Sequence, residues 1–375
     1  MLGTYGLGMM GTKTPNLAVT GMGVVLPCGT GIQAAKDALV AQSHSFVELP
    51  PELGQGNGMY RGAACTDFSD EGIIPPMTSR RLDRCARFAW VAASQALSQA
   101  MFDATSLSAM EVPMAIAVGT ITGGGEAAEG FMRPYLQHGR SAASPIYYQN
   151  SVAVSTSGHL AIAFGIKGAS TTQLGRESSF ISAIEQADRW LALGMAQAVM
   201  VVGTDALHPL VVELMYRSRL SCREGKLPKA FGGTGLLPGE GSQVFILEPA
   251  RCAKLRGAET LAEITHISVA SPKDNTAEHR AEALARAANC ACPGQPQSWV
   301  GGSNGHRVLD CVESMLAESR KDLPKGVFPK TLWGELCGGG GQLLAAAMLD
   351  STEDTLVTSP ASMGIQGAIR LRKHS

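Results

Sequence analysis

Glu177 has the side chain whose place in this sequence most suggests chemistry. It follows Gly175 and Arg176, where a short strand is expected to meet an amphipathic helix, and the positive end of that helix would stabilise a carboxylate. Arg176 and Lys330 are possible counter-charges. A carboxylate is a poor acyl acceptor, because an acyl anhydride at Glu177 would hydrolyse readily. The residue types therefore favour Glu177 as a member of a buried polar network over Glu177 as a catalyst.

The segments that would position Glu177 alternate between strands and helices. Apolar runs predict strands at 17–26, 112–118, 171–174, 198–202, 243–248, 262–270, 299–300 and 368–371. Helical spacing and capping signals predict helices at 30–39, 79–100, 149–164, 178–193, 250–256, 276–289 and 308–320, and one after the glycine-rich turn at 338–341. This alternation indicates an α/β protein with largely parallel sheets that are covered on both faces.

Composition excludes several classes of function. With 17% charged residues and a net charge of −1, the 375-residue chain gives no electrostatic case for nucleic acid or an anionic membrane. No apolar stretch approaches the roughly 20 residues that span a bilayer. The nine cysteines are scattered, which fits reduced thiols in a cytoplasmic protein. Cys290 and Cys292 lack a second pair or a suitably spaced histidine, so neither a metal site nor a cofactor is expected.

The chain is expected to divide into three parts. Residues 1–16 are rich in glycine and methionine, lack the apolar core of a signal peptide, and predict a loose leader. No repeat or low-complexity linker marks a boundary in the remainder. The least arbitrary division follows the strand at 243–248, which gives halves at 17–249 and 250–375.

An ordered series of short motifs extends over nearly the whole chain. They are Val19-Thr-Gly-Met-Gly-Val-Val25, Gly158-His-Leu-Ala161, the junction at 168–187, Val201-Val-Gly-Thr-Asp205, Pro238-Gly-Glu-Gly241 and Lys254-Leu-Arg-Gly-Ala258. Each is weak alone, but in this order and spacing the series resembles the β-ketoacyl synthase family. The resemblance implies the thiolase fold, an α/β architecture of duplicated halves in a five-layer αβαβα arrangement, and an obligate dimer.

Catalysis in that family uses a cysteine and two histidines, and this sequence departs from the family at all three positions. Glu177 stands at the position of the cysteine, Gly302 at that of the first histidine and Glu335 at that of the second. Lys330, in a Lys-x-x-x-Gly pattern, is retained, and His306 lies four positions after Gly302. The loss of three groups is a pattern, so we expect no catalytic residues in this chain.

This combination resembles a chain length factor, the non-catalytic subunit that pairs with an active ketosynthase in type II polyketide and aryl polyene systems. Glutamine is the usual substitution at the cysteine, so Glu177 is a departure that points toward the aryl polyene branch. Such a subunit closes the far end of the tunnel that holds the growing chain, and an acyl carrier protein delivers the phosphopantetheine-linked acyl groups. The resemblance puts the tunnel candidates at Ala127, Ala128, Phe131, Met132 and Tyr135.

Two further surfaces are implied by the resemblance. Tyr147 and Tyr148 are candidate anchors of the interface with the partner. Arg80, Arg81 and Arg84 fall where related synthases meet the acidic carrier protein, and an ordinary solvated helix face is the alternative for them.

Two other functions stay open at this point. The first is a malonyl-carrier-protein decarboxylase, or another acyl-processing homodimer, that uses Glu177 and Lys330 with His306 recruited nearby. It predicts turnover of malonyl carrier protein by this chain alone. The second is a homodimeric acyl-binding or scaffold protein, which predicts a stable homodimer that is indifferent to any co-expressed synthase.

Overall fold

A computed structural model describes residues 16–53, 60–222, 225–336, 338, 340–350 and 352–373. The predicted leader lies outside these residues except for Asn16. The described strands are β1 (Leu17–Leu26), β2 (Gly29–Thr30), β3 (Val47–Glu48), β4 (Arg61–Gly62), β5 (Ala115–Gly119), β6 (Ser170–Gln173), β7 (Val199–Asp205), β8 (Gly241–Pro249), β9 (Ala262–Ala270), β10 (Ser298–Val300), β11 (Gly326–Val327), β12 (Asp354–Ser359) and β13 (Gln366–Arg372).

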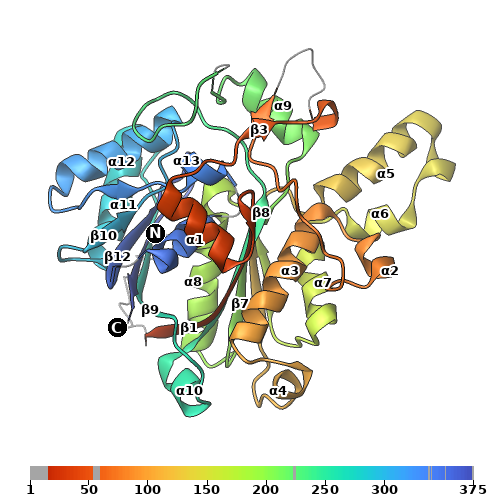
Figure 1. The fold of residues 1–375 in the computed structure, drawn as a ribbon, viewed down its shortest axis with the longest axis horizontal. Helices are drawn as coiled ribbons and strands as arrows, with labels where there is room; N and C mark the ends of the chain where they lie inside the picture. The colour runs from red at the N-terminus through yellow and green to blue at the C-terminus, as the bar shows by residue number, and fades with distance from the viewer. Residues whose placement is uncertain are drawn as a thin grey trace, which may run out of the picture.

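The described α-helices surround these strands (Figure 1). They are α1 (Ile32–Ala41), α2 (Pro76–Ser79), α3 (Arg84–Gln99), α4 (Ala104–Ser108), α5 (Gly125–His138), α6 (Pro145–Asn150), α7 (Ser155–Phe164), α8 (Ser179–Ala192), α9 (Pro209–Arg217), α10 (Ala250–Leu255), α11 (Ala277–Ala291), α12 (Arg307–Ser319), α13 (Lys330–Trp333) and α14 (Gly341–Leu349). No helix in the described part of the chain is long and apolar enough to cross a membrane.

One strand order occurs twice in the sheet. The first half has the order β1-β8-β7-β5-β6 and the second has β9-β13-β12-β10-β11. In each half, the strand that comes last in the sequence, β8 or β13, is antiparallel to its two neighbours in the order given. The remaining pairs within each half are parallel. β1 also pairs with β9 over Leu17–Val19, which joins the two orders. The duplication predicted for a thiolase fold is therefore visible in the topology, although the sequence has no readable repeat.

The helices form three layers around the two half-sheets. α8 and α14 lie between the half-sheets, α3 and α7 cover the outer face of the first, and α11 with α12 against it covers the outer face of the second. The central core joins Phe180 and Ile184 of α8 to Leu343 and Leu344 of α14. This is the predicted five-layer αβαβα arrangement, and it buries the start of α8, where Glu177 lies, in the middle of the molecule.

Some predicted elements differ from those in the structure. The helix predicted at 149–164 is two helices, because α6 ends at Asn150 and α7 begins at Ser155. The helix predicted at 79–100 begins at Arg84, since the Asp83 carboxylate accepts a hydrogen bond from the Ala86 amide and caps it. The sheet is not largely parallel, because β8 in the first half and β13 in the second are antiparallel to their neighbours. α9 and β12 were not predicted.

Candidate functional site

Glu177 lies in a 3-10 turn, Arg176–Ser178, directly before α8. Arg176 has a φ of 55°, a left-handed conformation that turns the chain sharply into the helix. Glu177 is 4% exposed, and its two carboxylate oxygens accept hydrogen bonds from Ser362 Oγ at 3.0 and 3.1 Å. Arg176 Nη2 lies 3.5 Å from Glu177 Oε1. The carboxylate is therefore held by groups of the chain itself in a buried polar network.

Gly302, predicted from the sequence to stand at the position of the first histidine, has no room for a side chain. A Cβ atom added there would lie 2.7 Å from Cδ and 2.9 Å from Cγ of Pro360. The amides of Gly302 and Ser303 donate to the buried Glu313 carboxylate at 2.9 and 2.7 Å, which fixes the backbone in this place. Because a proline ring cannot swing away as a flexible side chain does, Pro360 occupies the space that a histidine would enter.

Glu335, predicted to stand at the position of the second histidine, forms a buried ion pair with Lys330. Lys330 Nζ lies 2.7 and 2.9 Å from the two carboxylate oxygens, and the side chains are 2% and 1% exposed. The Asn304 side-chain amide also donates to Glu335. Burial raises the pKa of the Glu335 carboxyl, and the charge of Lys330 opposes that shift. Lys330 is therefore engaged by Glu335 inside the chain.

Buried carboxylates at the ends of strands hold the loops around these positions. Asp205, the last residue of β7, accepts hydrogen bonds from the amides of Ile121, Thr122 and Gly338 at 2.8, 3.0 and 2.6 Å. Burial raises the pKa of the Asp205 carboxyl. The sequence contained Asp205 within a family motif, but its role was not predicted, because its partners lie more than 80 residues away.

Glu240 plays a similar part in the loop before β8. Its carboxylate accepts hydrogen bonds from the Cys65 and Leu207 amides and from Arg84 Nε and Nη2, the last two at 3.0 and 2.7 Å. Arg84 is thereby engaged inside the chain. Arg80 and Arg81, the other predicted carrier-protein contacts, are exposed.

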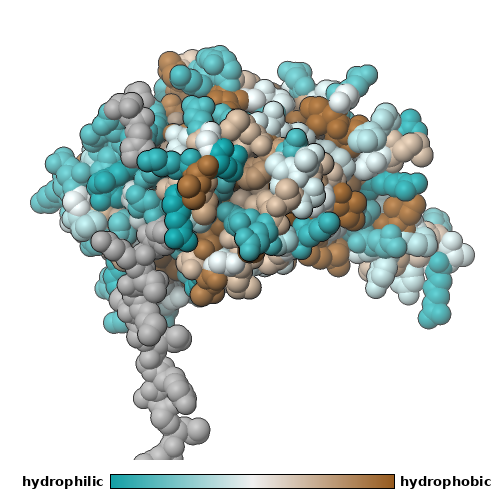
Figure 2. All heavy atoms as spheres, turned by 90° about the horizontal axis from the view of Figure 1, so that it is seen from below, coloured by the Kyte–Doolittle hydropathy of each residue, from teal (hydrophilic) through white to brown (hydrophobic). Residues whose placement is uncertain are grey.

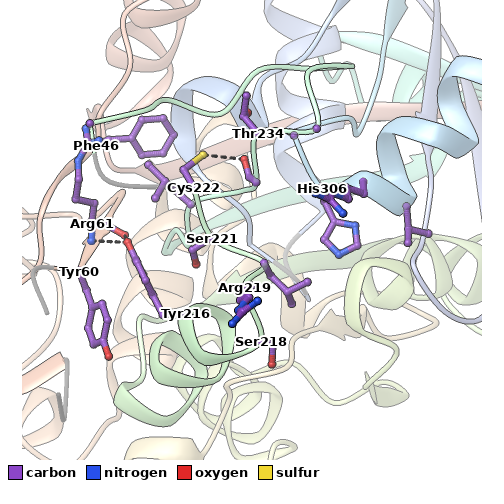
Figure 3. Close-up of a pocket in the computed structure, with 18 of the residues that line it drawn as sticks. Phe46, Tyr60, Arg61, Tyr216, Ser218, Arg219, Ser221, Cys222, Thr234 and His306 are labelled. Carbon is purple, nitrogen blue, oxygen red and sulfur yellow. Dashed lines mark hydrogen bonds between the residues drawn. The ribbon is translucent and has the colours of Figure 1, made fainter.

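A cavity of about 1540 Å³ opens beside this cluster of loops (Figure 3). Tyr60, Arg61, Arg219 and His306 lie around it. His306 is 8% exposed, its Nδ1 has no hydrogen-bond partner among the described residues, and burial lowers its pKa, so the imidazole is neutral at pH 7. The described residues that line this cavity do not include Glu177.

The predicted tunnel residues lie on α5, and the predicted interface tyrosines lie on α6. We call α5, the turn at 139–144 and α6 together the arm. Ala127 is buried and Ala128 and Phe131 are half-buried, whereas Met132 and Tyr135 are exposed by 45% and 37%. The arm is held together by ring contacts: Phe131 stacks on Tyr135 and meets Tyr148, at centroid distances of 6.1 and 5.3 Å.

The arm leaves apolar side chains uncovered. Tyr147 and Tyr148 are exposed by 47% and 64%, and Leu136 and Ile146 by 73% and 50%. Hydrophobic atoms are visible at the right-hand end of the molecule in Figure 2, the end at which the arm extends in Figure 1. The structure thus buries Glu177 and the Lys330–Glu335 pair, with the charge of Glu177 acting on Glu335, and puts Gly302 beside Pro360. The tunnel and interface candidates lie on a separate helical pair.

Comparison with known proteins places the chain in a family. The family model described as "Beta-ketoacyl synthase, N-terminal domain" matches residues 14–253. A 3-oxoacyl-[acyl-carrier-protein] synthase 2 of Vibrio harveyi is 24% identical over 366 residues, which are 91% of this chain and 86% of that protein. The corresponding synthase of Synechocystis is 26% identical over 266 residues, 68% of this chain and 63% of that protein.

Solved structures share the fold at low identity. The ishigamide ketosynthase/chain length factor matches with a TM-score of 0.83 and 19% identity, and covers 96% of this chain and 100% of the matched chain. A type II polyketide synthase acyl-carrier protein in complex with its ketosynthase, bound to the hexaketide, matches with a TM-score of 0.78 and 18% identity over the same shares.

Proposed function

Because the chain belongs to the β-ketoacyl synthase family, we propose that it is a catalytically disabled, chain length factor-like subunit that pairs with an active β-ketoacyl synthase. The observation that carries the proposal is the state of the three catalytic positions. Glu177 is tied to Ser362, Gly302 faces the ring of Pro360, and Glu335 is paired with Lys330. No thiolate is present there to accept an acyl group, and no imidazole pair to stabilise a developing enolate.

The arm supports the choice of a partner subunit over a free-standing protein. Contiguous apolar side chains on a helical pair are typical of a surface that another protein covers. β6 is the last strand of the first half's order, so one of its edges has no paired strand among the described residues. In the proposed heterodimer the partner covers the arm, and Phe131, Met132 and Tyr135 limit the tunnel in which the chain grows.

We infer type II polyketide elongation, in the aryl polyene branch, as the process that this subunit serves. Acyl groups would arrive as thioesters on the phosphopantetheine group of a carrier protein, and that carrier protein would contact the exposed Arg80 and Arg81. The solved structures that share the fold include a ketosynthase/chain length factor pair, which is consistent with this inference.

One observation favours the decarboxylase alternative. His306 is buried at the side of the large cavity, its Nδ1 has no partner among the described residues, and the charge of Glu177 raises its pKa against the effect of burial. A histidine and a carboxylate in electrostatic reach of each other could handle a proton. Against this alternative, the Glu177 carboxylate is already engaged by the Ser362 hydroxyl, whose single proton lies between the two carboxylate oxygens at Oγ···O distances of 3.0 and 3.1 Å.

Co-purification with an active ketosynthase of the same genome, followed by condensation and decarboxylation assays, tests the proposal. We expect a one-to-one complex that extends malonyl units, and no turnover by this chain alone. Release of carbon dioxide from malonyl carrier protein by the isolated chain, lost in Glu177→Ala, would support the decarboxylase instead. A stable homodimer that ignores the synthase would support the scaffold protein.

A further inference from the structure

The arm is attached to the body of the molecule at its two ends. At the start of α5, the Gly124 amide donates to Asp83 Oδ2 at 2.7 Å, and the Arg84 amide donates to Glu126 at 3.1 Å. Beyond this first turn, the aromatic rings of α5 in the described part of the chain contact one another and α6. The position of the arm therefore depends on few contacts, and each of them can be tested.

At the far end of the arm, Asn150 joins three parts of the chain. Its side-chain amide donates to the Arg81 carbonyl at 3.0 Å, so its Oδ1 is left as an acceptor. His159 Nε2 lies 2.9 Å from that Oδ1 and must carry the proton of this hydrogen bond. Burial lowers the pKa of His159, which keeps the imidazole neutral. One side chain thus connects α6 to α7 and to the loop before α3.

A second contact lies one turn into α5. His208 Nε2 is 3.2 Å from Glu129 Oε2, and Nδ1 of the same ring accepts a hydrogen bond from the Leu210 amide at the start of α9. Because Nδ1 is the acceptor, Nε2 carries the proton and faces the carboxylate, although the contact lacks full hydrogen-bond geometry. His208 is 9% exposed and the Glu129 side chain is 25% exposed, so this polar contact is partly buried.

We propose that the Asn150–His159 and Glu129–His208 contacts are two clasps that fix the pose of the arm, and that they thereby set how far the arm's aromatic side chains reach into the tunnel. The second half of this proposal rests on the function proposed above. These four residues are positioning residues, because Glu129 and Asn150 attach the arm to His208 and His159 and none of the four is among the residues proposed to line the tunnel. Product length would then depend on side chains that never meet the product.

The physical reason is that the aromatic rings of the arm lie close to the two clasps along α5 and α6. Phe131 and Tyr135 lie about half a turn and about one and two-thirds turns beyond Glu129 on α5, and Tyr148 lies two residues before Asn150 on α6. A small rotation at either clasp moves all three rings together, because Phe131 contacts both others. A tunnel end that is built from a linked group of rings is displaced as a unit when its support changes.

The test uses Asn150→Ala and Glu129→Ala in the complex with the ketosynthase. Gln149→Ala is the matched control, because Gln149 is exposed and is the neighbour of Asn150. Hydrogen–deuterium exchange over residues 126–149 should accelerate about fivefold or more in Asn150→Ala, as expected for the loss of a hydrogen bond, and by a smaller factor in Glu129→Ala, which removes a polar contact. It should not change in the control. Asn150→Asp keeps an oxygen that can accept the hydrogen bond from His159, so its exchange rate should lie between those of Asn150→Ala and the wild type.

Product analysis completes the test. In the clasp variants we expect a broader or shifted distribution of product chain lengths. Total malonyl consumption should stay within twofold of the wild type, and the complex should keep its one-to-one stoichiometry. Faster exchange with an unchanged length distribution would overturn the link to the tunnel, and unchanged exchange would overturn the clasps. If the wild-type chain forms no complex, the proposed function fails, and exchange measured on the isolated chain still decides whether the clasps hold the arm.

Discussion

The buried Lys330–Glu335 pair allows a quantitative prediction. Glu335→Gln keeps the shape of the side chain and removes a negative charge 2.7 Å from Lys330 Nζ, at a place where both side chains are at most 2% exposed. Removal of one member of a buried ion pair commonly costs about 3–5 kcal/mol, because the remaining ion stays in a medium of low dielectric. We expect a loss of that size in the free energy of unfolding.

The expected change in melting temperature follows from the length of the chain. An unfolding entropy of about 2.1 cal/mol/K per residue gives about 0.8 kcal/mol/K for 375 residues, so the loss corresponds to about 4–6 °C. The double variant Lys330→Met, Glu335→Leu should lose less than about 2 °C, since replacing both members of a buried pair by apolar groups is often neutral. The raised pKa of Glu335 agrees with this, because it means that ionisation of the buried carboxyl is itself costly.

Thermal unfolding followed by circular dichroism at pH 7.5 is the assay. Glu185→Gln is the control, because the Glu185–Arg189 pair lies one turn apart on the surface of α8 and should contribute less than about 1 kcal/mol. If Glu335→Gln melts as the control does, or if the double variant melts lower than the single one, the assignment of Glu335 as the electrostatic partner of Lys330 is wrong.

Three further predictions concern packing, pH and product. Gly302→Ala should destabilise the chain by about 1–3 kcal/mol through overpacking against Pro360, and the added change Pro360→Ala should recover part of it in a double-mutant cycle; additive effects would contradict the contact. Burial raises the pKa of Asp188 to about 6, above its ordinary value of 3.8, so the folded chain keeps a proton that the unfolded chain releases, and stability falls as the pH rises through that window. The free energy of unfolding of Asp188→Asn should therefore exceed that of the wild type by about 1 kcal/mol at pH 7.5, after allowance for partial exposure, and should equal it at pH 3.5. A gain in stability that does not vary with pH would refute the assignment. Phe131→Ala should lengthen the main product of the complex, measured by mass spectrometry, and an unchanged product would remove Phe131 from the tunnel.

Much of the fold could be predicted because its signals are local. The apolar run at 17–26 coincides with β1, and the helix predicted at 178–193 differs from α8 by one residue at each end. α9 was missed because His208 caps it through a ring nitrogen, which is not a usual capping signal. The break between α6 and α7 was missed because Asn150 is held by Arg81, a residue 69 positions away.

In the candidate site too, features that depend on local motifs could be predicted, and features that depend on residues distant in the sequence could not. The assignment of the cysteine and histidine positions to 177, 302 and 335 comes from motifs along the chain and stays a prediction. That Pro360 fills the space beside Gly302 could not be predicted, because the two residues meet through the pairing of β10 with β12. Nor does any local pattern indicate that Ser362 binds Glu177 across 185 residues.

The central claim is that this chain shapes the product and performs none of the chemistry. Its most direct test is the rate of malonyl extension by the complex that contains Glu177→Gln, measured beside the wild-type complex. The account predicts rates within about twofold, because Glu177 has a structural partner in Ser362 and no part in the reaction. A loss of about a hundredfold or more with the complex intact, the size seen when a group that acts in the transition state is removed, would make Glu177 a catalyst and contradict the account.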